Sequence, residues 1–444
     1  MAIHPSRTTR RKPPEPALVR IERVGSEGDG IAHLADGVPL YLPFTLPAEA
    51  VDARPLQPRG NGWHAVAETI TDAAASRVDP PCRHFGRCGG CVLQHWRDAE
   101  YRSWKSGLLS HALRQAGFSP PDPLGLVPGR PAERRRIDFA VRRVAGSVVM
   151  GLHGQRSAEV IDITDCLVLH PALMALIDPL RQLLGGIRAL RRQASVVINL
   201  LDSGADMLLC TDAPLTPADR IALIDFARDH GLARVSGASL SGASGNDTPE
   251  TIGLLRPATT TLSGVSVRPP PGAFLQATAT GERAIITAVL AAMPTKITAR
   301  TRIAELYAGC GTLTFALARV LRVAAFEGDA ATVVALRQAV NQSGLAGRIE
   351  ATQRDLARQP LSAKDLASFA AVVLDPPHGG AAAQIDQVAA ARVPTVVYVS
   401  CNPSTLSRDA RVLFAAGYHL ATATAIDQFL WSARLESVSV FRRG

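Results

Sequence analysis

Polar side chains that could take part in chemistry follow two apolar runs in the C-terminal half of the chain. Asp375-Pro376-Pro377 comes directly after AAVVL, and Ser400-Cys401-Asn402-Pro403 follows TVVYV. Ligands of open α/β sheets bind outside the carboxyl ends of the strands, so we expect Asp375 and Cys401 at one sheet edge. Cys401 there is a candidate nucleophile. The alternatives are a small buried residue for Cys401 and a turn former before proline for Asp375.

A second group of candidates surrounds a glycine-rich turn. The apolar run Ile303–Tyr307 leads into Ala308-Gly309-Cys310-Gly311-Thr312, and Glu327 follows the next apolar run, Val323–Phe326. Glycines allow the backbone to approach a ligand at a helix N-terminus, and an acidic residue after the second strand typically binds ribose hydroxyls. The third glycine of a dinucleotide fingerprint and the GK[ST] of a phosphate loop are missing. The pattern favours a nucleoside without a pyrophosphate, such as S-adenosylmethionine, with Asp355 as a further candidate at this edge.

Three of the seven cysteines are grouped as Cys82-x5-Cys88-x2-Cys91, with glycines between them. An odd number of unevenly spread cysteines is a poor match to a secreted disulfide framework, so the group points to a metal site or to catalysis. Thiolates can hold either zinc or a [4Fe–4S] cluster, and both remain open on spacing. The interval of five residues differs from the C-x3-C-x2-C pattern of radical S-adenosylmethionine enzymes. Cys210 and Cys310 are expected to be structural.

The chain of 444 residues is basic, with 48 Lys and Arg against 39 Asp and Glu and a net charge of +9. Only four of these 48 residues are lysines, and arginine binds phosphate bidentately and stacks on bases. The charge favours a nucleic-acid partner, although an alanine-rich composition of the kind that high-GC coding produces also raises the arginine content. One group that would either contact phosphate or form a solvated face comprises Arg130, Arg134, Arg135, Arg136, Arg142 and Arg143.

Composition and patterning predict a globular protein with several domains. Hydrophobic residues make up 47% of the chain, and no apolar run approaches the length of a membrane span. No secretory signal is recognisable, so we expect a cytoplasmic protein without membrane contact. Residues 1–17 form a flexible basic arm, residues 18–75 a small OB-like β-barrel of about five strands, and residues 76–268 a β-rich region with a helix near 98–115. From residue 269 to 444, strands alternate with helices, which is typical of a doubly wound parallel α/β sheet.

The sequence resembles the S-adenosylmethionine-dependent RNA 5-methyluridine methyltransferases, specifically the iron–sulfur branch that acts on 23S ribosomal RNA. The similarity runs from about Leu18 to the C-terminus, and the Ser-Cys-Asn-Pro element after a DPP strand end is its most specific part. The matching elements are CRHFGRCGGCVLQHW (Cys82–Trp96), AFLQAT, ELYAGCGTLTFALA, FEGD, LDPPHG, VSCNPSTLSRD and Leu435-Glu436-Ser437-Val438. The resemblance implies a Rossmann-like class I methyltransferase domain, an N-terminal RNA-binding barrel of the TRAM type and a central iron–sulfur domain.

The resemblance also implies a role for individual residues. Cys401 would be the nucleophile that adds to C6 of uracil, and Glu436 would be the general base that removes the C5 proton. Cys166 would complete the ligand set of a [4Fe–4S] cluster with Cys82, Cys88 and Cys91. The positions implied for S-adenosylmethionine binding are Gln276, Tyr307, Thr312, Glu327, Asp355 and Asp375.

Three departures from the family pattern concern target choice and the surroundings of the base. His378 follows the DPP element where relatives often carry Arg, and Leu167 replaces the usual Pro after Cys166. The segment before Glu436 reads FLWSARL and lacks the usual Pro-His pair.

Several alternative functions follow from the same residues. The enzyme could modify tRNA instead of 23S rRNA, and the sequence does not name the uridine. An exocyclic-amino methyltransferase would want an aromatic residue at His378 and would leave Cys401 and Glu436 without a task. A non-catalytic RNA-binding or ribosome-assembly factor on this fold would tolerate loss of Cys401. We expect a monomer with RNA as its partner.

Overall fold

A computed structural model describes residues 12–240, 248–298 and 301–444. Most of the predicted basic arm, including Arg7, Arg10 and Arg11, lies outside these residues. The chain forms two compact units. The first comprises Met1–Gly86, Cys91–Trp104 and Trp431–Ala433, and the second comprises Arg87–Gly90, Lys105–Leu430 and Arg434–Gly444. In the described residues, no helix is both long and apolar enough to cross a membrane.

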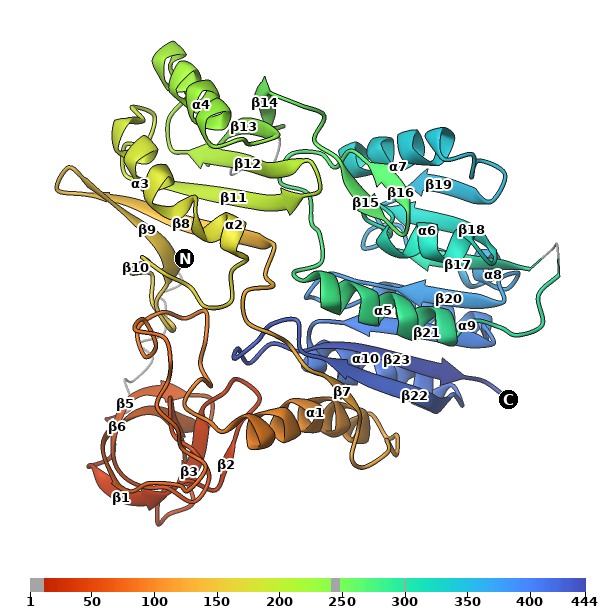
Figure 1. The fold of residues 1–444 in the computed structure, drawn as a ribbon. Helices are drawn as coiled ribbons and strands as arrows, with labels where there is room; N and C mark the ends of the chain where they lie inside the picture. Colours follow the sequence, from red (N-terminus) through yellow and green to blue (C-terminus); the bar gives the residue numbers. More distant parts are fainter. Residues whose placement is uncertain (1–11, 241–247, 299–300) are drawn as a thin grey trace, which may run out of the picture. The chain divides into compact units, whose positions relative to one another are not determined.

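The first unit contains a six-stranded sheet, counted over its described residues, with the order β1-β5-β6-β4-β3-β2. Figure 1 shows this sheet curling round on itself. Alternate side chains such as Val51 and Ala53 point into its apolar core. About five strands were predicted here, and the OB-like class of the barrel stays a prediction. The strands are β1 (Ala17–Arg20), β2 (Arg23–Val24), β3 (Gly30–His33), β4 (Pro39–Leu42), β5 (Ala50–Arg59) and β6 (Gly62–Asp72).

The predicted helix near 98–115 is present as α1 (Asp98–Gln115). Asp98 and Glu100 lie in its first turn and Arg114 in its last, which complements the helix dipole at both ends.

A second sheet has seven strands in the described residues, with the order β10-β9-β8-β11-β12-β13-β14. Along β8, Ile137, Phe139 and Val141 point into an apolar core with α3 and α4, and the residues between them lie on the opposite face. The strands are β8 (Arg136–Val144), β9 (Ser147–His153), β10 (Val160–Asp162), β11 (Gln193–Leu201), β12 (Gly204–Thr211), β13 (Arg234–Ser239) and β14 (Glu250–Leu254). The helices are α2 (Pro171–Met174), α3 (Ile177–Gly186) and α4 (Pro217–Asp229). A short hairpin, β15 (Thr260–Leu262) and β16 (Val265–Val267), precedes the C-terminal region.

The C-terminal region forms an eight-stranded sheet, again counted over described residues, with the order β19-β18-β17-β20-β21-β23-β22-β7. The first five of these strands are parallel, as predicted, because helices connect them. The strand pattern did not predict the arrangement at the other side, where β23 runs antiparallel between β21 and β22. The strands are β7 (Leu126–Val127), β17 (Arg302–Leu306), β18 (Arg322–Glu327), β19 (Ile349–Gln353), β20 (Ala371–Leu374), β21 (Thr395–Ser400), β22 (His419–Ile426) and β23 (Glu436–Arg442).

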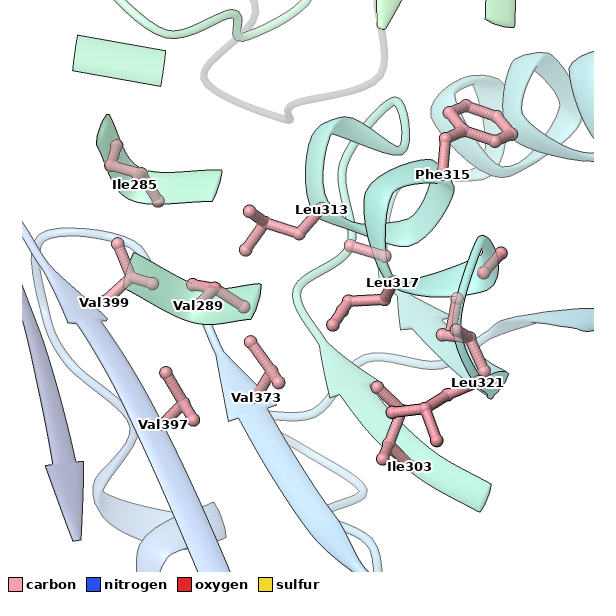
Figure 2. Packing of buried hydrophobic residues seen from close by; sticks show 14 of the residues in the cluster. Ile285, Val289, Ile303, Leu313, Phe315, Leu317, Leu321, Val373, Val397 and Val399 are labelled. Carbon is pink, nitrogen blue, oxygen red and sulfur yellow. The ribbon is translucent and has the colours of Figure 1, made fainter. Parts of the chain in front are cut away.

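Helices cover both faces of this sheet, so its central strands are buried on both sides. Figure 2 shows one face, where Val373 and Val397 pack near Val289 of α5. On the other face, the hydroxyl of Tyr398 donates to Asp409 of α10 at 2.6 Å. The helices are α5 (Ala279–Ala291), α6 (Thr312–Ala318), α7 (Ala330–Gln342), α8 (Ala363–Leu366), α9 (Ala382–Ala391) and α10 (Pro403–Ala415).

Candidate active site

Three strands of the C-terminal sheet bring candidate catalytic side chains to one edge. Asp375 follows β20 and Cys401 follows β21, as the strand pattern predicted. Glu436 is the first residue of β23, and β23 runs antiparallel to β21 with Ser400 opposite Ser437. The beginning of β23 therefore lies at the same edge as the end of β21, which places Glu436 beside Cys401. The hydroxyl of Ser437 also donates to the carbonyl oxygen of Ser400 at 3.2 Å.

A chain of amide side chains connects Asp375 to Glu436. Gln276 donates from Nε2 to Oδ2 of Asp375 at 3.3 Å. Gln428 donates from Nε2 to Oε1 of Gln276 at 2.9 Å and to Oε2 of Glu436 at 2.7 Å. Its own Oε1 accepts the backbone N–H of Ala277 at 3.2 Å, which fixes the orientation of the amide. Gln428 thus uses both amide hydrogens and its oxygen, and this holds the Glu436 carboxyl group in one place.

Burial makes the two carboxyl groups of the network unusually weak acids. Desolvation raises the pKa of Glu436, whose residue is 3% exposed, and the nearby charge of Asp375 raises it further. The hydrogen bond from Gln428 acts in the opposite direction and lowers the pKa of Glu436. Desolvation likewise raises the pKa of Asp375. Among the described residues, Oε1 of Glu436 has no hydrogen-bond partner, so it is available to a substrate.

Cys401 is a half-buried thiol whose surroundings hold it protonated. Burial raises its pKa to about 11, and the charges of Glu436 and Asp375 contribute in the same direction. The guanidinium group of Arg434 opposes them and lowers the pKa of the thiol. A positive charge at this position therefore favours the thiolate, which is the nucleophilic form of cysteine.

Arg434 is held beside the site by His378, the residue that departs from the family pattern after DPP. Arg434 donates from Nη1 to Nε2 of His378, which requires that nitrogen to be unprotonated. Asn402 donates from Nδ2 to the carbonyl oxygen of His378 at 3.0 Å and caps α10 by accepting from the N–H of Ser404. His378 and Arg434 thus form a polar pair next to Cys401.

The glycine-rich turn after β17 contains three residues with left-handed backbone conformations. Tyr307, Gly309 and Gly311 have φ angles of 64°, 55° and 100°, in the left-handed region. A side chain at Gly311 would collide with the ring of Phe315, 2.5 Å from the nearest ring atom, so this position requires glycine for packing. At Gly309, by contrast, the space beside the backbone is open to 4 Å, which leaves room for a ligand.

Glu327, at the end of β18, is fixed next to this turn. Its Oε2 accepts the N–H of Gly309 and its Oε1 accepts the N–H of Asp329, both at 2.9 Å. The carboxylate is acceptor-only and retains lone pairs for the hydroxyls of a ribose. The open backbone at Gly309 and this carboxylate together fit a nucleoside such as that of S-adenosylmethionine.

The remaining cofactor positions lie at the same edge. Thr312 begins α6, and Tyr307 lies just past β17 instead of closing it as predicted. Asp355 lies beyond β19 and accepts the N–H groups of Ala357 and Arg358. Of the six positions implied for S-adenosylmethionine binding, Gln276 and Asp375 are hydrogen-bonded to each other.

Sequence reasoning missed two buried polar residues of the site. Gln428 lies just before the segment that departs from the family pattern, and no local motif marks it. Glu305 lies inside β17, where burial raises its pKa to about 8, with the charges of Asp375 and Glu327 contributing in the same direction. An acidic residue among the apolar residues that follow Arg302 in the strand RIAEL is the one signal that could have singled out Glu305.

Comparison with known proteins identifies the family. The family model for tRNA (uracil-5-)-methyltransferases matches residues 265–443. An uncharacterized RNA methyltransferase of Rhizobium meliloti is 36% identical over 96% of this chain and 99% of its own. The 23S rRNA (uracil(1939)-C(5))-methyltransferase RlmD of Pectobacterium atrosepticum is 30% identical over 98% and 95%. The chain belongs to the RNA methyltransferase family. It is therefore an enzyme of the class that the sequence predicted.

A solved structure shares the fold over most of the RNA methyltransferase chain. The tRNA (uracil-54, C5)-methyltransferase of Pyrococcus abyssi, determined in complex with S-adenosyl-L-homocysteine, superposes with a TM-score of 0.71. It covers 96% of this chain and 100% of its own at 18% sequence identity, so the likeness concerns the fold.

The cysteines predicted to bind metal are not in disulfides. All seven cysteines of this RNA methyltransferase lie in the described residues and none of them forms a disulfide, and the four candidates are half-buried. Cys82 and Cys91 belong to the first unit, and Cys88 and Cys166 belong to the second. Within the described parts of the chain, no three His, Cys, Asp or Glu side chains are gathered as metal ligands. Cysteine sulfur is the ligand type that iron–sulfur clusters use, and the ligand set stays a prediction.

Two arginines from the predicted phosphate-binding group hold the protein's own structure together. Arg135 forms an ion pair with Glu282 at 2.5 Å and donates to the carbonyl oxygen of Gln276 at 3.1 Å. Arg143 donates to several carbonyl groups at the end of α3, including those of Leu184 and Ile187. Both guanidinium groups thus make contacts within the protein.

Proposed function

We propose that this RNA methyltransferase transfers a methyl group from S-adenosylmethionine to C5 of a uridine in RNA, and that its substrate is 23S rRNA. We propose further that the enzyme is a cytoplasmic monomer. The observation that carries the proposal is the meeting of Cys401 and Glu436 at one sheet edge, with Gln428 bonded to Glu436. The choice of 23S rRNA rests on the similarity to the enzyme of Pectobacterium atrosepticum. The alternative substrate is tRNA.

Cys401 makes uracil reactive. C5 of uracil is a poor nucleophile, and addition of the Cys401 thiolate to C6 solves this by covalent catalysis. As the S–C6 bond forms, the electron pair of the C5=C6 double bond moves toward the C4 carbonyl, giving an enolate with carbanion character at C5. The thiol proton passes to solvent, to which the half-buried Cys401 is open.

Six residues would bind the methyl donor and hold it at the sheet edge: Gln276, Tyr307, Thr312, Glu327, Asp355 and Asp375. S-adenosylmethionine, when bound, supplies the electrophilic methyl group that C5 takes up. The open backbone at Gly309 and the fixed carboxylate of Glu327 support this placement.

Glu436 completes the reaction as general base. Its unpaired Oε1 takes the C5 proton, the C–H electron pair re-forms the C5=C6 double bond, and the S–C6 bond breaks to release the Cys401 thiolate. Only the carboxylate form can accept this proton. Because burial raises the pKa of Glu436, we expect the rate of methylation to rise with pH as the carboxyl group ionises.

Arg434→Met is expected to slow the first step. Removing the guanidinium group removes the charge that lowers the pKa of Cys401, so less thiolate is present at neutral pH. We expect adduct formation with 5-fluorouridine RNA at pH 7.5 to slow by roughly tenfold, with partial recovery at higher pH. The measurement is the rate of covalent complex formation as a function of pH.

The matched control is Arg322→Met. Arg322 is exposed at the first residue of β18, at the opposite end of the sheet from the site, and this variant should match the parent enzyme. An unchanged rate and pH profile for Arg434→Met would exclude Arg434 from activation of the thiol.

For the metal, we propose that Cys82, Cys88, Cys91 and Cys166 bind a [4Fe–4S] cluster. The support is the cysteine spacing and the family resemblance, and none of the four cysteines is in a disulfide. We expect four irons per chain after anaerobic purification and loss of this iron in Cys88→Ser. The control is Cys210→Ser, because Cys210 is a half-buried cysteine outside the proposed ligand set. One zinc per chain in place of iron would overturn the cluster.

Mass mapping of RNA from a strain that lacks the gene tests the proposed function. We expect one 5-methyluridine to disappear from 23S rRNA and to return when the gene is restored. Disappearance from tRNA alone would establish the alternative substrate. Unchanged 5-methyluridine in both RNAs would overturn the proposal.

A further inference from the structure

Lys105 is a lysine that the reaction does not use and that the fold buries completely. It lies in α1 and is 0% exposed, and its Nζ is 2.9 Å from Oδ1 of Asp427, which is 1% exposed. Nζ also donates to the carbonyl oxygens of Phe429, at 3.3 Å, and Arg434. These contacts comprise one ion pair and two hydrogen bonds. These three partners lie between residues 427 and 434.

The segment 427–434 connects β22 to β23 and thereby precedes Glu436. Asp427 and Phe429 are the two neighbours of Gln428, which bonds to Glu436. Arg434 lies two residues before Glu436, and its positive charge lowers the pKa of Cys401. Lys105 therefore contacts the segment on both sides of Gln428, at Asp427 and Phe429, and again at Arg434.

We propose that Lys105 is a positioning residue for the reaction, which holds segment 427–434 so that Gln428 bonds to the general base Glu436. The proposal rests on the proposed function, because it takes Glu436 as the base. Lys105 touches neither substrate nor reacting atoms and acts through the carbonyl groups and the carboxylate that it binds.

Stability alone is a weak reason for such an ion pair. Two buried charges lose their hydration, and replacing a buried pair with apolar residues of similar volume is often neutral or stabilising. An apolar pair could fill the same volume, but it could not bond to the carbonyl groups of Phe429 and Arg434. The hydrogen bonds are thus what the lysine adds, and they end on the segment that carries Gln428.

Loss of the Lys105 contacts is expected to change the pH dependence of methyl transfer. The groups that face Glu436 are Asp375 after β20, Cys401 after β21 and Gln428 before β23, with Arg434 acting on Cys401. Of these, the Gln428 hydrogen bond favours the ionised carboxylate. If segment 427–434 shifts and this bond is lost, the carboxylate forms only at higher pH.

The test uses the full-length double variant Lys105→Met/Asp427→Leu, which removes both charges and so leaves no unpaired buried ion. Two reactions are followed across pH. Formation of the covalent adduct with 5-fluorouridine RNA requires Cys401 but no removal of a C5 proton, whereas turnover on uridine RNA requires Glu436. We expect adduct formation within about threefold of the parent enzyme, turnover at pH 7.5 reduced about tenfold or more, and the rising limb of the turnover profile moved to higher pH.

The control is Lys364→Met, because Lys364 is an exposed lysine of α8. This variant should match the parent enzyme in both reactions. Lys105→Met/Asp427→Asn, which is also uncharged, replaces the first variant if the latter does not fold. Unchanged turnover with an unchanged pH profile would overturn the positioning role, as would an equal loss in both reactions. Absence of an adduct with the parent enzyme would instead overturn the proposed function itself.

Discussion

Replacing Cys401 with alanine is expected to abolish methyl transfer and covalent adduct formation together. The side chain supplies the bond to C6 on which every later step depends, and removal of a covalent nucleophile typically lowers turnover by roughly 10⁴-fold or more. The protein should remain folded, because Cys401 is half-buried beyond the end of β21 and the change removes one sulfur atom. Labelled methyl incorporation into RNA, measured beside the melting temperature, checks both expectations.

Cys210→Ala is the matched control for this variant. Cys210 is also a half-buried cysteine, but it lies in β12 of a different sheet. We expect full methyl transfer from it. Turnover of Cys401→Ala within tenfold of the parent enzyme would show that C5 is activated in another way.

Glu436→Gln is expected to separate the two halves of the reaction. The amide keeps the size of the carboxyl group and cannot accept the C5 proton, so addition of Cys401 and methyl uptake proceed while elimination stops. Loss of a general base costs about 10²–10⁴-fold in turnover. The distinctive result is a methylated covalent complex that accumulates on ordinary uridine RNA and survives denaturing electrophoresis.

Glu350→Gln provides the comparison for this second change. Glu350 lies in β19 and pairs with Arg302 at the surface, so the same substitution there should leave turnover unchanged and trap nothing. If Glu436→Gln loses turnover without accumulating a complex, Glu436 acts before the adduct forms, which contradicts its role as the base for C5.

The edge with Asp375 and Cys401 was predictable because each residue directly follows a buried parallel strand. The glycine turn and Glu327 were predictable for the same reason, since they end β17 and β18. Local patterns suffice here because the parallel order of strands places all carboxyl ends together.

Glu436 and Gln428 were beyond the reach of local patterns. Glu436 joins the site because β23 is inserted antiparallel between β21 and β22, and a strand pattern does not reveal its neighbours. The family resemblance supplied Glu436, but it did not supply Gln428, whose importance lies in contacts with residues 8 and 152 positions away. Lys105 was hidden in the same way, because its partners are more than 320 positions distant in the chain.

The charge pattern leaves the position of the RNA-binding surface open. The arginines between 130 and 143 were counted as a group, yet Arg135 and Arg143 bond within the protein. Arginine serves buried ion pairs and helix ends as well as phosphates, so its number alone does not locate an RNA surface.

Peptide mapping of the complex with 5-fluorouridine RNA and S-adenosylmethionine tests the central claim most directly. Fluorine at C5 cannot be removed as a proton, so the reaction stops with the base still bound to the enzyme. The account predicts one methylated nucleotide per chain, attached to the peptide that contains Cys401 and absent from Cys401→Ala. Attachment to a different residue, or no attachment by an enzyme that methylates uridine RNA, would contradict it.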